Sequence, residues 1–198
     1  MTYEQLEQKL HELAPRLAPT RRAVAEARQM ASAAQSAVQQ ARAEYNYYAG
    51  MSADGMTDEQ QQKLQMVASK LAEQVSEAES MQRSAEERLT RARAELDALE
   101  SSLRQLAGGY ETVKSRLYAE MGKLRETIDK LAGLRNNRYG SSLEGAEQTA
   151  TAVFNDRHNK YNNCNIRIRQ ISQALNGSND DDDDRDPPQK VLTKGRGR

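Results

Sequence analysis

An apolar series runs without losing step through the stretch from Asp58 to Leu134. Every seventh position from Ala68 on is apolar, with one polar exception, and a second series interleaves with the first. An apolar repeat that averages 3.5 residues is typical of a helix that buries a narrow seam against another helix. The seam positions are Ala68, Val75, Gln82, Leu89, Leu96, Leu103, Tyr110, Leu117, Leu124 and Leu131, interleaved with Leu64, Leu71, Ala78, Ala85, Ala92, Leu99, Leu106 and Val113. The pattern predicts one coiled-coil helix over 58–134, roughly 115 Å long at 1.5 Å per residue.

A second seam, rich in alanine, precedes this helix. Its positions alternate spacings of three and four: Tyr3, Leu6, Leu10, Leu13, Leu17, Thr20, Val24, Ala27, Ala31, Ala34, Val38, Ala41, Tyr45 and Tyr48. Small seam residues favour close helix packing over a membrane-active surface, because alanine offers little apolar area. Pro15 and Pro19 lie off the seam, and each removes a helical hydrogen bond. We therefore expect a short helix near 2–13 and a longer one from about Pro19 to Ala49.

The segment from Gly50 to Thr57 has the composition of a turn. Gly50 suits a left-handed helix end, Asp54-Gly55 is turn chemistry, and Thr57 with Gln60 forms a capping box. A short turn between two seams predicts an antiparallel hairpin over 1–107, with arms at about 2–49 and 58–107.

The register of this hairpin follows from opposing large seam residues to small ones. Pairs whose residue numbers add to about 109 satisfy that rule, so that Ala34 faces Val75 and Val24 faces Ala85.

Gly108-Gly109 interrupts the long helical pattern. Two glycines inside a helix cost about 2 kcal/mol relative to two alanines. The chain either reverses at this point or continues as a helix with a weak point. Because the seam keeps step from Leu103 through Tyr110 to Leu117, we favour continuation.

The second half, 108–176, is expected to be a helical extension with a shorter hairpin of arms at about 110–135 and 142–175. Ser141 and Glu144 form a second capping box. The last helix is expected to run back along 110–134 toward the diglycine. Its apolar side is read as Leu143, Ala146, Ala150, Val153, Tyr161, Cys164, Ile168, Ile171 and Leu175.

Composition supports an elongated all-α protein. The chain has eight Tyr, one Phe and no Trp, and its 29 Lys and Arg balance 29 Asp and Glu. The charge is uneven, however, because residues 49–109 hold 11 acids and 7 bases (net −4) and residues 110–175 hold 7 acids and 11 bases (net +4). Residues 177–198 contain an aspartate run, two prolines and a basic end, which predicts a disordered tail. The alternative for this tail is a peptide ligand, Val191 to Arg198, on an acidic spacer.

No arrangement of catalytic side chains emerges, so no enzyme, cofactor or metal site is predicted. His11 and His158 fall in different helices without a partner at metal-ligand spacing. Cys164, the single cysteine, lies on the apolar side of the last helix and is interpreted as a small buried hydrophobe. Gly108-Gly109 lacks the Lys-Ser/Thr that follows a phosphate-binding loop.

The predicted function is that of a coiled-coil structural or adaptor protein, a scaffold or spacer in a protein assembly. Protein partners through helical faces or the tail, and homo-oligomerisation, are expected. With no secretory signal or spanning segment in the sequence, a cytoplasmic location is also expected. The alternative is a module that binds an anionic membrane surface or nucleic acid through the basic half. Its interaction surface would consist of Arg135, Arg138, Arg157, Lys160, Arg167 and Arg169.

Removal of residues 177–198 is expected to leave helix content and melting temperature nearly unchanged, because no apolar periodicity ties this segment to the helices. Circular dichroism during a thermal scan measures both quantities. A melting temperature lowered by more than a few degrees would show that the tail docks.

Overall fold

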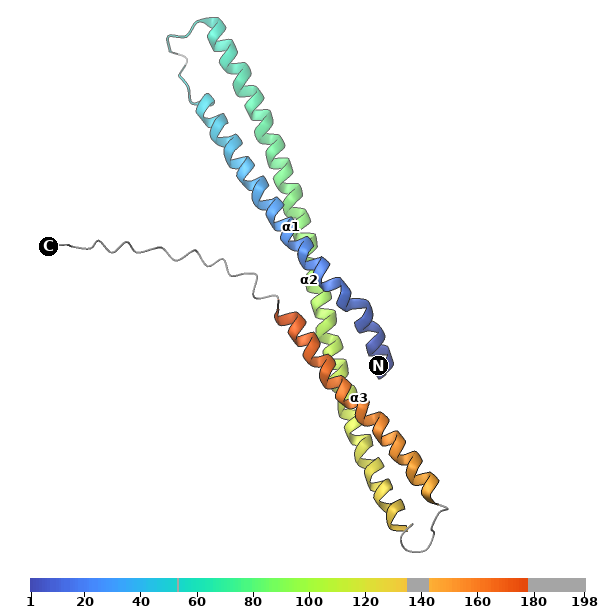
Figure 1. Ribbon diagram of the computed structural model, residues 1–198. Coiled ribbons are helices and arrows are strands. Elements are labelled where there is room, and N and C mark those ends of the chain that lie inside the picture. The colour runs from blue at the N-terminus through green and yellow to red at the C-terminus, as the bar shows by residue number, and fades with distance from the viewer. Residues whose placement is uncertain (53, 135–142, 178–198) are drawn as a thin grey trace, which may run out of the picture. The chain divides into compact units, whose positions relative to one another are not determined.

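The computed structural model describes residues 1–52, 54–134 and 143–177, and these form three helices (Figure 1). Their bounds are α1, Tyr3–Ala49; α2, Asp58–Leu134; and α3, Glu144–Asn176. The all-α class and the antiparallel packing of neighbouring helices are confirmed. The predicted tail, 177–198, lies outside the described residues from position 178 on.

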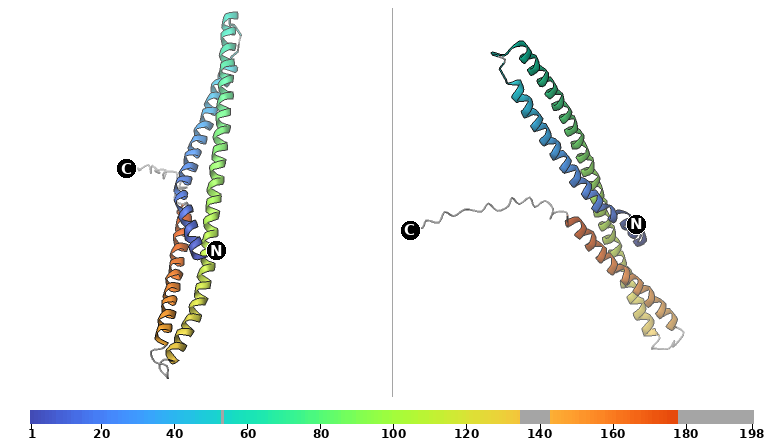
Figure 2. Two further views of the ribbon diagram at one scale, coloured as in Figure 1. Left: turned by 90° about the vertical axis from the view of Figure 1, so that its right-hand side faces the viewer. Right: turned by 45° about the horizontal axis from the view of Figure 1, so that its top comes forward.

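Contacts divide the chain into two units. The hairpin unit, Gln8–Leu103, contains α1 and α2 side by side and antiparallel, as the views of Figures 1 and 2 agree in showing. The three-helix unit joins Met1–Glu7 to the chain from Arg104 on, and in it α3 runs back along α2. The division into domains at 1–107 and 108–176 stays a prediction.

α1 is one helix, which corrects the prediction of two. Pro15 and Pro19 both lie inside it. A proline lacks the amide hydrogen that a helix needs, so the carbonyls of His11 and Pro15 lose their usual donor. Both proline side chains are exposed, while Leu17 between them is buried. The seam therefore packs without interruption across the stretch that lacks these two hydrogen bonds.

The predicted seams of α1 and α2 are confirmed by burial. Every predicted position on both helices is buried or half-buried, apart from Tyr48, which is 36% exposed. The register of apolar residues in the sequence thus fixes which face of each helix is covered.

The N-terminal half of the α3 seam differs from the prediction. Ala146 and Val153 are exposed, whereas Glu147, Phe154 and Arg157 are half-buried. With these residues the spacings alternate four and three from Leu143 to Leu175 without exception. The predicted seam places Ala146 and Val153 at positions where the regular spacing requires Glu147 and Phe154. A regular helix buries one continuous stripe, so a residue on that stripe is buried even where its neighbour is more apolar.

The connection between α1 and α2 contains the predicted capping box. The Thr57 amide donates to Gln60 Oε1 (2.9 Å), and the Gln60 amide donates to Thr57 Oγ1 (3.4 Å). The left-handed position is Gly55, with φ +79°, and no other described residue has a positive φ. The expectation for Gly50 is therefore wrong, since its amide simply extends the helical pattern to the Asn46 carbonyl (3.0 Å).

The start of α3 has no such cap. The helix begins at Glu144, and Leu143 at the N-cap position makes no side-chain capping hydrogen bond. Ser141, the predicted capping residue, lies outside the described residues.

Two ion pairs within the hairpin unit correct its predicted register. Arg21 Nη2 lies 3.4 Å from Glu100 Oε1, and Arg42 Nη2 lies 2.7 Å from Glu79 Oε1. The residue numbers of each pair add to 121, against 109 for the predicted layers. A mismatch of 12 positions is about 18 Å along a helix, which is more than these two side chains span together.

A register one heptad further on, with layers that add to 116, agrees with these pairs. It keeps both seams in phase and places Leu17 opposite Leu99, which are 6% and 5% exposed. The predicted pair of Ala34 and Val75 is then offset by seven residues. Because both seams repeat every seven residues, a shift of one heptad preserves most small-against-large matches, and the pattern alone does not distinguish the two registers.

Further ion pairs flank the seam of α2, some within the helix and some to α1. Within α2, Glu59 pairs with Lys63 (2.7 Å) and Glu87 pairs with Arg91 (3.4 Å). Glu79 and Glu100 pair across the seam with Arg42 and Arg21 of α1. These pairs add contacts between the helices at the flanks of the seam, where the Arg21–Glu100 pair is partly shielded from water and the Arg42–Glu79 pair is exposed.

We predict that cysteines at Ala31 and Ala85, in a Cys164→Ser background, form an intrachain disulfide under dilute oxidation. These positions add to 116 and carry small side chains, so their backbones approach closely enough for a disulfide. Non-reducing gels and peptide mapping measure the product. The matched cysteine pair at Ala34 and Val75 is expected to stay reduced. Efficient disulfide formation by that pair would instead support the register whose paired residue numbers add to 109.

Candidate interaction site in the three-helix unit

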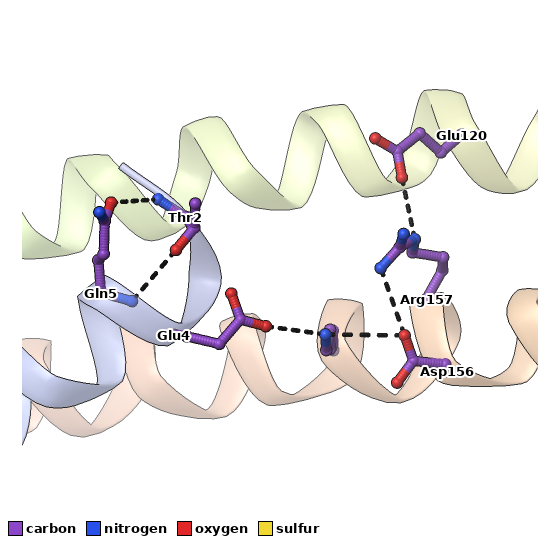
Figure 3. Close-up of polar contacts among 7 residues, drawn as sticks. Thr2, Glu4, Gln5, Glu120, Asp156 and Arg157 are labelled. Carbon is purple, nitrogen blue, oxygen red and sulfur yellow. Dashed lines mark hydrogen bonds and ion pairs between the residues drawn. The ribbon is translucent and has the colours of Figure 1, made fainter.

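The first turns of α1 pack against α2 and α3. Leu6, Tyr110 and Cys164, one residue from each helix, are all fully buried at 0% exposure. We call residues Met1–Glu7 the docking segment. A capping box of the sequence Thr2–Gln5 starts its helix, with the Thr2 amide donating to Gln5 Oε1 (2.8 Å) and the Gln5 amide to Thr2 Oγ1 (3.3 Å) (Figure 3).

The diglycine lies inside α2, which confirms that the helix continues through it. The two glycines have different surroundings. A Cβ atom at Gly109 would lie 2.7 Å from Leu6 Cδ2 and 3.5 Å from Met1 Cε, whereas a Cβ at Gly108 would meet nothing within 4 Å. Gly109 thus forms a notch that admits the Leu6 side chain, and it is the glycine that the packing requires.

The Glu7 carboxylate lies beside this notch and accepts three hydrogen bonds. Tyr110 donates its hydroxyl to Oε1 (2.8 Å), and Arg167 donates Nε to Oε1 (3.0 Å) and Nη2 to Oε2 (2.8 Å). The paired bonds from Arg167 are the planar arrangement in which guanidinium and carboxylate match best. The buried Tyr110 ring needs a partner for its polar end, and Glu7 supplies it. One side chain of α1 therefore connects to both other helices.

Burial and hydrogen bonding act in opposite directions on these groups. Burial raises the pKa of the Glu7 carboxyl, but the bonds from Arg167 and Tyr110 outweigh it and leave the pKa below its usual value. Burial, followed by the hydrogen bond to Glu7, raises the pKa of Tyr110 well above its usual range. The hydrogen bond to Glu7 raises the pKa of Arg167. The cluster is therefore a charged Glu7–Arg167 pair with a neutral tyrosine.

A second, more exposed set of contacts surrounds the docking segment. Lys160 Nζ lies 2.9 Å from Glu4 Oε1 and 3.7 Å from an Asp156 oxygen. The same ammonium lies 5.9 Å from the centre of the Tyr3 ring, which meets the Tyr110 ring edge-on at 6.3 Å. The hydrogen bond from Lys160 is the main cause that lowers the pKa of Glu4 to about 2.

Arg157 makes the corresponding connection between α3 and α2. Its Nε lies 3.0 Å from Glu120 Oε2, and its Nη1 lies 3.3 Å from Asp156 Oδ2. Figure 3 shows Arg157 between Glu120 on α2 and Asp156 on its own helix, with Glu4 reaching the same row of charges from α1. Exposed pairs of this kind contribute about 0–1 kcal/mol each, so they orient the helices more than they stabilise them.

The predicted basic surface falls largely within these contacts. Arg157, Lys160 and Arg167 are paired with carboxylates of α1, α2 or α3, while Arg169 is exposed. Arg135 and Arg138 lie outside the described residues. The structure does not test binding by this surface, but three of its cations face internal partners.

The sequence did not reveal the acidic partners of this cluster. Glu4, Glu7 and Gly109 received no role from the apolar pattern, although Tyr110 was recognised as a seam residue. Glu7 lies 103 positions from Tyr110 and 160 from Arg167 along the chain. The one available signal was a tyrosine within an otherwise aliphatic seam, since a buried hydroxyl implies a polar partner.

A shallow groove of about 310 Å³ lies near the α1–α2 turn, in the hairpin unit. It is lined by Tyr48, Met56, Gln60, Lys63, Leu64 and Val67, and we call it the turn groove. Among the described residues, no three His, Cys, Asp or Glu side chains gather as a metal site would need. The described helices also include none with the length and apolarity needed to cross a bilayer.

Comparisons with known proteins give no relative: no family model, curated protein or solved structure matches the chain.

The two glycines are expected to respond oppositely to alanine. Gly108→Ala is predicted to raise the free energy of unfolding by about 1 kcal/mol, because a helix-interior glycine is replaced in open space. Gly109→Ala places a methyl group against Leu6, so the same helical gain is offset by displacement of a buried side chain. Urea unfolding of each variant measures the difference. Equal stabilisation by both substitutions would show that Leu6 does not occupy the notch.

Glu7→Gln is expected to lower the free energy of unfolding near pH 7 by about 1–2 kcal/mol, since it removes the charge that Arg167 binds. The hydrogen bonds from Arg167 and Tyr110 hold the folded pKa of Glu7 below its unfolded value of 4.5, so the stability that the carboxylate contributes is complete above pH 4.5 and is lost as the pH falls through the folded pKa. The gap between wild type and variant should therefore narrow as the pH falls below about 4.5.

Urea unfolding near neutral pH and in acid measures this gap, and Glu126→Gln, at an exposed position of α2, is the matched control. A gap that stays constant with pH, or one equally large in the control, would contradict the assignment.

Proposed function

We propose that this chain is a non-enzymatic coiled-coil scaffold or spacer in a protein assembly. The observation that supports the proposal most is that one helix, α2, provides the packing seam for both units. In the hairpin unit it pairs with α1, and in the three-helix unit with α3. A chain whose apolar residues are used along one continuous helix presents long helical faces to partners, which is how coiled-coil adaptors bind.

Exposed apolar side chains on the hairpin unit offer a contact surface. Val67, which lines the turn groove, is 41% exposed, and its neighbour Met66 and Tyr47, which precedes the groove residue Tyr48, are 73% and 65% exposed. Methionine and tyrosine are enriched at protein interfaces because they combine apolar area with adaptable or polar ends. We therefore propose that the turn end of the hairpin unit contacts a protein partner or a second copy of the chain, in the cytoplasm.

The alternative, binding of an anionic membrane or nucleic acid, has less support. Such binding requires basic side chains that are free to meet phosphates. Arg157, Lys160 and Arg167 already meet carboxylates, and Glu120 and Asp156 lie among them. The scaffold proposal therefore predicts little binding to anionic vesicles or duplex DNA at physiological salt.

The scaffold proposal is tested by cross-linking of the tagged chain in its native cells, followed by mass spectrometry of the linked peptides. The test variant is Tyr48→Ser with Val67→Ser in the turn groove, and the control is Gln62→Ser with Gln65→Ser on the same helical end. We expect a defined protein partner, or the chain itself, to link near the groove, and the test variant alone to lose those links with unchanged helix content. Links that both variants retain, or salt-sensitive binding to vesicles or DNA, would contradict the proposal.

A further inference from the structure

The notch at Gly109, together with Tyr110, Lys160 and Arg167, has the features of a binding site for a short helix. We propose that it is an exchangeable docking site, and that the docking segment of a second copy of this chain occupies it in trans. The inference rests on the proposed scaffold function and names how copies of the scaffold connect.

The site recognises three side chains of the segment by shape and charge. Leu6 fills the notch, where a Cβ at position 109 would stand 2.7 Å from its Cδ2. Glu7 accepts three hydrogen bonds from α2 and α3, and Glu4, one turn earlier on the same face, pairs with Lys160. Both acids of the segment thus face a basic partner. A segment without the leucine or the acids would lose the fit.

The docking segment is weakly coupled to the helix that carries it. Its contacts assign Met1–Glu7 to the three-helix unit, whereas α1 from Gln8 on belongs to the hairpin unit. Between the segment and most of α1 stand Pro15 and Pro19, which remove two hydrogen bonds from the helix ladder. Segments that are anchored by few buried side chains open locally without global unfolding. Leu6 is the one fully buried side chain of this segment.

A second copy suits the vacated site because it carries the identical segment. Exchange between two chains reforms every contact of the docking segment, so the two arrangements differ mainly in the entropy of association and in strain at the hinge. The hydrogen bonds that the prolines remove from α1 give the position of that hinge, near His11 and Pro15. Higher protein concentration should therefore favour the exchanged form.

Single cysteines placed on the two sides of the notch test the exchange in the full chain. One variant carries Leu6→Cys and the other Gly109→Cys, both with Cys164→Ser. The new Cβ at position 109 would stand 2.7 Å from Leu6 Cδ2 of its own chain and so weakens the contact within that chain, whereas the shorter cysteine at position 6 of the other chain fits beside it. Mixed and oxidised, the two variants are expected to form a disulfide-linked heterodimer.

The matched control replaces the second variant by Gly108→Cys, at the neighbouring position where a Cβ meets nothing within 4 Å. We expect at least about five times more heterodimer with position 109 than with 108, because a disulfide needs Cβ atoms within about 4.5 Å. A synthetic peptide of residues 1–14 with Leu6→Ala, whose short side chain fits beside the new Cβ, should suppress the heterodimer, and the same peptide with Leu6→Asp should not.

A chain with both Leu6→Cys and Gly109→Cys reports the contact in cis. If it closes within one chain while the mixed variants give no excess over the 108 control, exchange does not occur and the proposal is overturned. If it does not close at all, the docking contact itself is absent and the proposal fails with it. Neither result affects cross-links at the turn groove, so failure of the scaffold function is distinguished by its own test.

Discussion

The apolar seam of α2 is the constraint on which the other elements depend. A helix with a narrow apolar stripe is stable in water only where another helix covers that stripe. In the hairpin unit α1 covers it, and in the three-helix unit α3 does so together with the first turns of α1. The buried face of each helix follows from covering this one seam, and the ion pairs between helices lie beside it.

Gly109 shows how the packing requirement overrides local preference. A glycine inside a helix costs about 1 kcal/mol relative to alanine, and α2 contains two in succession. The first has open space beside it and no packing role, while the second provides room for Leu6. The close approach of α1 to α2 at Gly109 also brings Glu7 within hydrogen-bonding distance of Tyr110 and Arg167. The polar cluster therefore depends on the glycine.

The sequence predicted the elements that depend on periodicity. The seams of α1 and α2, the capping box at Thr57 and the helix through the diglycine follow from repeats and local hydrogen bonding, which are encoded within a few residues. The register between α1 and α2 could not be predicted in this way, because a seven-residue repeat matches itself after a shift of one heptad. Pro15 and Pro19 predict a break in the first helix, but the structure keeps it continuous. The local cost of the prolines is outweighed by the packing of a seam that buries Leu17. The Glu7 cluster joins residues over 100 positions apart, and no local pattern marks such pairs.

The central claim is that α2 remains one helix through Gly108-Gly109. Spin labels at Ser101 and Arg116, both exposed, in a Cys164→Ser background test it by pulsed electron resonance. Fifteen helical residues place the two backbones about 22 Å apart, and a single narrow distance distribution consistent with that separation is the expected result. A chain reversal at the diglycine would bring the labelled segments to the spacing of neighbouring helices, about 8–10 Å, and such a short distance would contradict the account.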